Sequence, residues 1–293
     1  MFLHILSYQV EWDSKAGIPE VQRIATSLNL DTNEIQTITT SAEDIDEVQI
    51  ITSSAISQGK VQTITVSPPP GENTLNSLYG YSLKLDTVGT GGSVQYSGEI
   101  SATANAFGSR SSLQESLGAM SNIDSLPQVS KSGMNPDGGY TYSITFPTSM
   151  RDVPELEVYL SEVPIYISTL ENANLLDGFF RLEYNGDVTE LIPSDADESQ
   201  MKIALEELPS IGDVVISRSM SDDQNGFTWT VQFVSTENSG NLDNLIVHSD
   251  DITTSNAMGG ASITVVSGSD GSYIEGTFLI KFGKFRTHFF YLE

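Results

Sequence analysis

The chain has 293 residues, enough for two or three ordinary domains, and a formal net charge of -26, from 13 Lys and Arg against 39 Asp and Glu. A surface this negative repels phosphate backbones and anionic lipids, which argues against nucleic-acid binding and membrane-surface binding. The absence of cysteine excludes disulfide bonds, thiolate metal sites and a cysteine nucleophile. No stretch approaches the roughly 18 apolar residues of a membrane-spanning helix, so membrane insertion is not expected.

The first segment, residues 1–19, is expected to be the tail of a preceding β-domain copy. Tyr8–Trp12 resembles a later segment, Tyr142–Phe146. Ile18–Glu20 is similar to Val153–Glu155 in the same way. The segment lacks the basic start and uninterrupted apolar stretch of a signal peptide. We therefore expect the chain to begin inside one domain, with any leader and further domains outside it.

A short repeat occupies residues 20–67, and its four units begin 14, 13 and 13 residues apart. Each unit is rich in Val, Ile and Thr, which favour strands, and the polar residues between units favour turns. One such strand cannot bury its apolar face alone. We therefore expect the four strands to stack or pair with one another, with ladders of Gln and Thr side chains, before a boundary at Pro68–Gly71. The units are Glu20–Ser27, Glu34–Ser41, Glu47–Ser54 and Lys60–Ser67.

A long repeat follows the short one. Similar segments begin at Gly80, Gly178 and Gly276, which are 98 residues apart. A second landmark recurs, because Gly139–Phe146 matches Gly226–Phe233. The repetition predicts consecutive copies of one β domain.

Each copy is expected to carry one short helix. In the second copy, apolar residues at i, i+3, i+4 and i+7 define one face of a helix, with Ser194 and Asp197 as the expected cap and Pro209 as the expected end. The first copy repeats part of this spacing. The apolar positions are Met201, Ala204, Leu205 and Leu208 in the second copy and Leu113, Leu117 and Met120 in the first.

These patterns predict a mainly all-β fold class. We expect tandem Ig-like β-sandwich domains, each with one short helix, plus a region of short-period strand repeats. The sandwich copies are expected at residues 72–170 and 171–275. Residues 276–293 are expected to begin a truncated third copy.

The serial Glu-Val-Gln-x-Ile-x-Thr-Ser units, with the segments Gly178–Tyr184 and Gly226–Phe233, resemble large secreted proteins of heterokont algae. These are the tubular mastigoneme, or flagellar hair, proteins and the related sexually induced proteins of diatoms. The resemblance covers roughly residues 8–282. It implies an extracellular, self-assembling structural role on flagellar hairs, with no catalytic residues to carry over.

No catalytic, cofactor-binding or metal-binding residue is predicted. His4, His248 and His288 are far apart and lack ligand spacing, so we expect them at the surface or in turns. No Gly-x-Ser-x-Gly elbow is present, which argues against a hydrolase. Gly89–Gly92 lacks the Lys-Ser/Thr of a phosphate-binding loop and is expected to be a flexible loop.

Paired carboxylates are plentiful and are expected in solvated loops, because a glycosidase pair needs one acid buried in a cleft. Calcium is the next interpretation, with Asp222–Gly226 as the best loop, although Asn225 followed by Gly226 also suits a hairpin turn. The pairs are Glu43 with Asp44, Asp195 with Asp197 and Glu198, Asp222 with Asp223, and Asp250 with Asp251.

Two further kinds of side chain recur at matching positions. Trp229 and Tyr142 are expected to anchor the cores of their domains, with a sugar-binding surface as the alternative. Arg218 and Lys131 each stand beside a strand, where we expect a structural salt bridge.

Two nested repeats without a catalytic constellation predict a non-enzymatic structural segment of an extracellular filament that acts by self-assembly. The expected partners are further copies or other filament subunits, contacted through edge strands or the short repeats. The alternative is a cell-surface adhesin or glycan-binding module, which predicts exposed aromatic residues or bound calcium at one end of a domain. A carbohydrate-active enzyme would require a buried carboxylate pair in a cleft.

Overall fold

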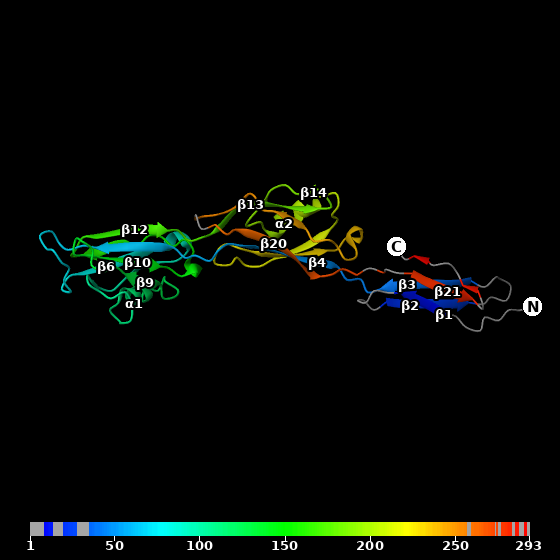
Figure 1. Cartoon of the computed structure of the whole chain (residues 1–293), viewed down its shortest axis with the longest axis horizontal. Helices are drawn as coiled ribbons and strands as arrows, with labels where there is room; N and C mark the ends of the chain where they lie inside the picture. The colour runs from blue at the N-terminus through cyan, green and yellow to red at the C-terminus, as the bar shows by residue number, and fades with distance from the viewer. Residues whose placement is uncertain are drawn as a thin grey trace, which may run out of the picture.

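A computed structural model describes residues 9–13, 20–27, 35–256, 259–272, 274, 277–282, 285–286 and 290–291. The molecule is elongated, with three lobes in a row (Figure 1). All paired strands are antiparallel, and the described part of the chain contains only two α-helices. The prediction of a mainly β, sandwich-like fold is confirmed. Within those ranges, no helix has the length and apolar character needed to cross a membrane.

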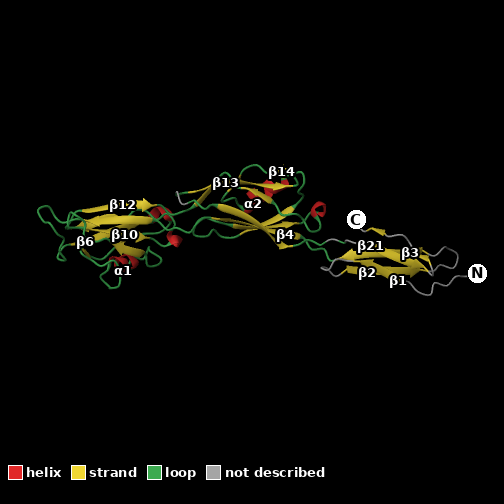
Figure 2. Ribbon diagram, in the orientation of Figure 1, coloured by secondary structure: helices red, strands yellow, loops and turns green. Residues whose placement is uncertain are grey.

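The first outer lobe, here called the distal sandwich, spans residues 55–171 and contains one α-helix. Its elements are β5 (Val61–Val66), β6 (Gly80–Asp86), η1 (Val88–Thr90), β7 (Val94–Tyr96), β8 (Ile100–Ser101), α1 (Leu113–Gly118), β9 (Gln128–Lys131), β10 (Tyr140–Thr145), η2 (Thr148–Met150), β11 (Glu157–Ser161) and β12 (Ile165–Glu171). One sheet has the order β12-β5-β10-β9, and the other has the order β11-β6-β7, with β8 also paired to β6. Figure 2 shows the strands of this lobe with the short helix beside them.

The central lobe, here called the middle sandwich, is built from residues 43–54 and 172–272. Its elements are β4 (Glu47–Ser54), β13 (Leu176–Tyr184), β14 (Asp187–Val188), β15 (Ile192–Pro193), α2 (Glu198–Glu206), β16 (Val214–Arg218), β17 (Thr228–Phe233), η3 (Thr236–Asn238), β18 (Ile246–His248), β19 (Ile252–Thr254) and β20 (Ser262–Ser269). One sheet has the order β16-β17-β4-β20, and in the other β13 pairs with β14, β15, β18 and β19. The two sandwiches therefore share one strand plan.

The third lobe brings together strands from near the two ends of the chain. In one sheet, β21 (Thr277–Phe282) pairs with β1 (Gln9–Asp13), β22 (Phe285–Arg286) and β23 (Phe290–Tyr291). In the other sheet, β2 (Glu20–Ser27) pairs with β3 (Ile35–Ala42). The segments predicted as the tail of one copy and the start of another thus meet through β1 and β21.

The chain runs outward through the lobes and then returns. The outgoing strand β4 lies between β17 and β20 of the middle sandwich, and the next strand, β5, lies between β12 and β10 of the distal sandwich. The expectation that all four short repeats stack on one another is therefore wrong for Glu47–Ser54 and Lys60–Ser67, although β2 and β3 do pair. A central position gives each strand two hydrogen-bonded neighbours and a sandwich core to cover its apolar face.

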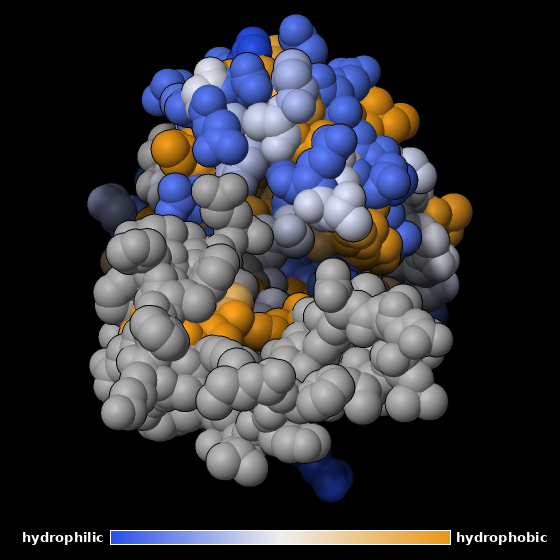
Figure 3. All heavy atoms as spheres, turned by 90° about the vertical axis from the view of Figure 1, so that its right-hand side faces the viewer, coloured by the Kyte–Doolittle hydropathy of each residue, from blue (hydrophilic) through white to orange (hydrophobic). Residues whose placement is uncertain are grey.

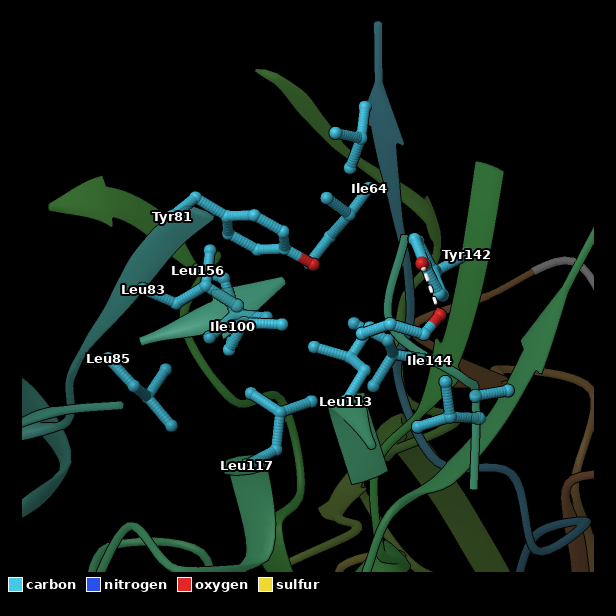
Figure 4. Close-up of a cluster of buried hydrophobic side chains, with 14 of the residues drawn as sticks. Ile64, Tyr81, Leu83, Leu85, Ile100, Leu113, Leu117, Tyr142, Ile144 and Leu156 are labelled. Carbon is cyan, nitrogen blue, oxygen red and sulfur yellow. Dashed lines mark hydrogen bonds between the residues drawn. The ribbon is translucent and has the colours of Figure 1, made fainter. Parts of the chain in front are cut away.

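Each sandwich encloses its own hydrophobic core. In the distal core, Tyr81, Leu83 and Leu85 of β6 face Ile64 of β5, and α1 closes one side through its buried leucines (Figure 4). Ile64 lies outside the predicted range 72–170. Ile51 of β4 likewise belongs to the middle core while lying outside residues 171–275.

The register of the long repeat differs by one residue from the sequence alignment. Tyr81 pairs with Ile100 as Phe180 pairs with Ile192, so the first strands align with an offset of 180 − 81 = 99 residues. Aligning Gly80 with Gly178 would turn core side chains outward, because facing alternates along a strand. Gly178 is required for a different reason, since its φ of +90° belongs to a conformation that favours glycine.

The two helices form where predicted, with corrected ends. Asp197 caps α2, since its carboxylate accepts from Gln200 N and the Gln200 side chain accepts from Asp197 N, each at 2.8 Å. Ser194 is buried upstream and is not the cap. The helix ends at Glu206, before Pro209. In the distal sandwich, α1 begins after its cap Ser112 and ends before the buried Met120.

Candidate assembly site

The glutamine of the short repeat is a buried hydrogen-bonding group. Gln49 of β4 is fully buried. Its Nε2 donates to Asp243 O at 3.1 Å, and its Oε1 accepts from Leu245 N at 2.9 Å. The side chain therefore ties the sheet that contains β4 to a segment of the opposite side of the sandwich.

The same arrangement recurs in the distal sandwich. Gln62 of β5 is also fully buried, with Nε2 donating to Pro154 O at 2.9 Å and Oε1 accepting from Leu156 N at 2.9 Å. In both cases the two backbone groups belong to residues i and i+2 of one segment. The recurring Gln is thus a specific requirement of the central-strand position, because an unpaired buried amide would cost about 1–3 kcal/mol.

The rest of the central strand alternates between core and cross-strand contacts. Ile51 and Ile64 point into the cores and are completely buried, which contributes about 1.5–3 kcal/mol each. On the opposite face, hydroxyl groups meet across the sheet. The pairs are Thr63 Oγ1 with Ser168 Oγ at 2.8 Å, Thr65 Oγ1 with Thr141 Oγ1 at 3.1 Å, and Thr52 Oγ1 with Thr228 Oγ1 at 3.4 Å. The prediction of Gln and Thr ladders between repeat strands is therefore wrong. Gln49 and Gln62 bind backbone groups, and the Thr hydroxyls pair with neighbouring strands that are not repeat units.

The recurring cations bind backbone carbonyl groups instead of forming the predicted salt bridges. Lys131 Nζ donates to Thr103 O and Ala104 O, both at 2.9 Å. The Tyr142 hydroxyl donates to the same Ala104 O at 2.6 Å (Figure 4). Burial lowers the pKa of Lys131 and raises the pKa of Tyr142. Among the described residues, Lys131 therefore forms no salt bridge, because carbonyl oxygens of the segment before α1 accept its hydrogen bonds.

The middle sandwich repeats this unit with a different cation and ring. Arg218 Nη1 donates to Asp195 O at 2.6 Å and to Ala196 O at 2.9 Å. Trp229 Nε1 donates to Ala196 O at 2.9 Å. Trp229 and Tyr142 are both completely buried, so they anchor cores as predicted.

A polar junction couples the two sandwiches. Arg151 follows η2 of the distal sandwich and donates through Nη2 to Ser221 Oγ at 2.6 Å and to Asp222 O at 3.3 Å. Thr148 Oγ1 donates to Asp223 Oδ2 at 2.7 Å. These contacts join the end of β10 in one sandwich to the β16–β17 hairpin of the other.

The hairpin loop Asp222–Gly226 is explained without calcium. Asp222 Oδ1 accepts from Gln224 N at 2.8 Å and from Gly226 N at 2.6 Å, so the carboxylate closes the turn. The equivalent turn of the distal sandwich uses Asn135, whose Oδ1 accepts from Gly139 N at 2.7 Å. A neutral amide serves the same purpose there, which favours the hairpin interpretation.

The distal sandwich also presents two edge strands next to each other. β11 and β12 stand at the ends of their sheets and contact each other. Tyr166 and Leu170 of β12 are 69% and 63% exposed, and Leu160 of β11 is 64% exposed. No charged residue occurs from Ile165 through Leu170. Natural edge strands are usually protected by charge, so this edge is a candidate contact surface.

An aromatic pair and a groove lie beside β11. The rings of Tyr96 and Tyr159 have centroids 4.4 Å apart. Tyr159, Leu160 and Ser82 line a groove of about 420 Å³. Both tyrosines are exposed and lie on strands, Tyr96 on β7 and Tyr159 on β11, and not on loops at one end of the domain as the binding-module alternative predicts.

His248 is the histidine that the structure describes, and its Nε2 lies 2.7 Å from Glu183 Oε2 at a partly exposed site. His4 and His288 lie outside the described residues. Across the residues that the structure describes, no group of three or more His, Cys, Asp or Glu could hold a metal ion. Gly89–Gly92 forms a tight turn, closed by Gly92 N donating to Thr87 O at 2.8 Å.

The paired carboxylates all lie at the surface. Glu198 begins α2 and Asp197 caps it, whereas the other carboxylates lie in loops or turns as predicted. None of them is buried as a glycosidase acid would be. The exposed residues are Glu43, Asp44, Asp195, Asp197, Glu198, Asp222, Asp223, Asp250 and Asp251.

One buried carboxylate was missed by sequence reasoning. Glu47, the first residue of β4, is 1% exposed, and its Oε2 accepts from Gly271 N at 2.8 Å. The equivalent residue of the next repeat is Lys60, directly before β5, and its Nζ lies 3.1 Å from Asp152 Oδ1. Glu47 and Lys60 begin consecutive repeat units with opposite charges. This difference could have indicated that each residue has its own polar partner in its own sandwich.

Figure 3 views the molecule from the lobe that contains β1 and β21. Beyond the terminal residues, the described surface in this view is mostly hydrophilic, with hydrophobic side chains scattered among the polar ones. No protein-family model matches the chain, and no curated protein matches it.

Proposed function

We propose that the chain is a structural repeat segment of an extracellular filament, such as a flagellar hair, and acts by self-assembly. The observation that carries the proposal is the uncharged edge strand β12, with Tyr166 and Leu170 exposed. An edge strand keeps a row of N–H and C=O groups available for pairing with another chain. The net charge of -26 opposes contacts elsewhere on the surface, so the uncharged edge is favoured for association.

The arrangement of the lobes supports the same function. Two sandwiches with separate cores lie in a row and are joined by Arg151 and Thr148, which suits an extended, load-bearing unit. The extracellular location and the flagellar hair are supported by the resemblance of the short repeat units.

Edge substitution tests this proposal. Leu170→Lys and Tyr166→Lys place a charge on the pairing surface, so concentration-dependent association in sedimentation velocity should fall by at least tenfold. Ile203→Lys is a matched control, because Ile203 is 57% exposed but lies on α2, away from the edge. Equal association of all three variants and the unchanged chain would show that the β12 edge does not mediate self-association.

A glycan-binding module is the second candidate, and the tyrosine pair favours it. Tyr96 and Tyr159 present aromatic faces beside the groove, and such faces stack on the apolar face of a sugar ring. In this function, Tyr159→Ala would abolish retention on an immobilised glycan panel while leaving association unchanged. A chain that retains no glycan would leave self-assembly as the supported function.

A further inference from the structure

The central-strand position of each sandwich requires a short and specific sequence. The strand must supply Gln for the two backbone groups opposite and Ile for the core, whereas the next inward residue differs, being Ser53 in β4 and the buried Val66 in β5. In β4 these residues are Gln49, Ile51 and Ser53. Ser53 adds a further contact, because its Oγ accepts from Phe227 N at 2.9 Å.

The same sequence occurs in the third lobe. Glu34–Ser41 has Gln36, Ile38 and Thr40 in the same order and spacing. A threonine at the last position keeps the hydroxyl that Ser53 uses. In the described residues, the strand formed by this unit, β3, pairs with β2 and not within a sandwich. The chain therefore carries more strands of this kind than the two sandwiches hold.

We propose that the β4 position of the middle sandwich also accepts Glu34–Ser41 from a second copy of the chain, so that copies are linked by strand exchange. In domain swapping, a strand from one copy replaces the equivalent strand of another copy and reuses its contacts. Glu34–Ser41 differs from Glu47–Ser54 at three positions, and it would displace the resident β4 while keeping the Gln, Ile and hydroxyl groups that β4 uses. The inference deepens the proposed self-assembly, but it uses a buried strand position and not the edge of the distal sandwich.

The residues on the face of the strand that points away from the core favour Glu34–Ser41 over Glu20–Ser27 as the incoming strand. Thr39 occupies the position of Thr52, whose hydroxyl meets Thr228 across the sheet. Glu20–Ser27 has Ala25 at that position and Arg23 two residues before it. It would therefore lose the hydroxyl contact and bring a cation between neighbouring strands, which makes it the weaker donor.

Three substitutions test whether the two units are interchangeable. Val48→Ile, Ile50→Thr and Ser53→Thr together convert β4 into the sequence of Glu34–Ser41 within the full chain. We expect the midpoint of the Trp229 fluorescence transition to stay within about 5 °C of the unchanged chain, since 1 kcal/mol shifts a domain of this size by roughly that amount. The matched control is the single variant Ile51→Asp, which should lower the midpoint far more. A triple variant as unstable as Ile51→Asp would overturn the proposal.

A peptide assay tests exchange between molecules. In the full chain, we expect Ile51→Pro to displace β4, because proline cannot donate to the ladder and Ile51 pairs with Trp229 in the sheet. Trp12→Phe leaves Trp229 as the single tryptophan reporter. A synthetic peptide with the sequence of Glu34–Ser41 should restore the emission of buried Trp229. Its affinity should be within tenfold of that of the Glu47–Ser54 peptide, while the Glu34–Ser41 peptide carrying Gln36→Leu and Ile38→Asp should have no effect.

Each result of the peptide assay has a definite meaning. Rescue by both natural peptides supports exchange. Rescue by the Glu47–Ser54 peptide alone shows that the donor was chosen wrongly, and rescue by neither contradicts exchange between molecules. Edge pairing is independent of these readouts, because it is measured with Leu170→Lys and Tyr166→Lys on an intact middle sandwich. Failure of strand exchange and failure of self-assembly are therefore distinguishable.

Discussion

Gln49 and Gln62 lie in different sandwiches, yet each joins a backbone C=O to a backbone N–H two residues further along. Their strands are adjacent in sequence and separate in space. The last two units of the short repeat are therefore central strands, each with the Gln and Ile that its own sandwich requires. The units that contain β4 and β5 begin 13 residues apart because the outgoing chain passes through one sandwich and then directly enters the next.

Replacing either glutamine should destabilise only its own sandwich. Gln49→Leu and Gln62→Leu each leave a buried N–H and a buried C=O without partners, at a cost of about 1–3 kcal/mol. Gln128→Leu is the control, because Gln128 is an exposed residue of β9. Calorimetry with Trp229 emission would assign each loss to a lobe. A loss for Gln128→Leu as large as for the other two would contradict the special role of the buried amides.

Two buried tyrosines should respond in opposite ways to loss of the hydroxyl. Tyr81 is 2% exposed, and its hydroxyl has no hydrogen-bond partner, whereas the Tyr142 hydroxyl donates to Ala104 O. Tyr81→Phe should therefore leave stability unchanged or raise it by about 1 kcal/mol, and Tyr142→Phe should lower it by about 1–2 kcal/mol. Urea unfolding at neutral pH measures both. Destabilisation by Tyr81→Phe would show that its hydroxyl makes a contact.

Alkaline pH should destabilise the distal sandwich. Burial raises the pKa of Tyr81 and of Tyr142 above the usual value near 10. A raised folded pKa gives stability that is present below pH 10 and is lost as pH rises, by up to about 1.4 kcal/mol per pH unit for each group. The lowered pKa of Lys131 acts in the opposite direction, since its contribution rises with pH toward 10.5.

The pH dependence can be separated by substitution. Tyr81→Phe should flatten the loss of unfolding free energy between pH 10 and pH 11 relative to the unchanged chain, because burial raises the pKa of Tyr81. Guanidinium unfolding at closely spaced pH values provides the measurement. An unchanged slope in Tyr81→Phe would mean that this tyrosine titrates normally in the folded chain.

The junction between sandwiches should depend on one arginine. Arg151→Ala removes the donors to Ser221 and Asp222, so small-angle scattering should show a broader distribution of lobe separations. Because the contact is exposed, the change in unfolding free energy should stay below about 1 kcal/mol. Arg110→Ala, at another exposed arginine, is the control. Identical scattering from the two variants would indicate that other contacts set the junction.

Local patterns in the sequence predicted where strands and helices form better than they predicted which strands pair with each other. Val, Ile and Thr at Glu47–Ser54 predicted a strand, and the apolar spacing near Leu205 predicted a helix, because both depend on neighbours along the chain. The pairing of β4 with β17 and β20 depends on residues far away in sequence. A repeat that looks uniform therefore suggested stacking among its own units, whereas β4 and β5 join sheets of two different sandwiches.

The same reasoning applies to the candidate sites. The recurrence of Arg218 and Lys131 correctly marked equivalent positions, but the type of partner was wrong, because backbone carbonyl groups leave no trace in the sequence. The alignment of Gly80 with Gly178 matched two glycines that serve different purposes. Exposed edges such as β12 are also invisible until the strand order is known.

Self-assembly can be tested by electron microscopy of the native assembly from its source. We expect this segment at a regular axial spacing within a filament, with β12 at a contact between neighbouring copies. Isolated chains projecting from a cell surface, without contacts between copies, would contradict it.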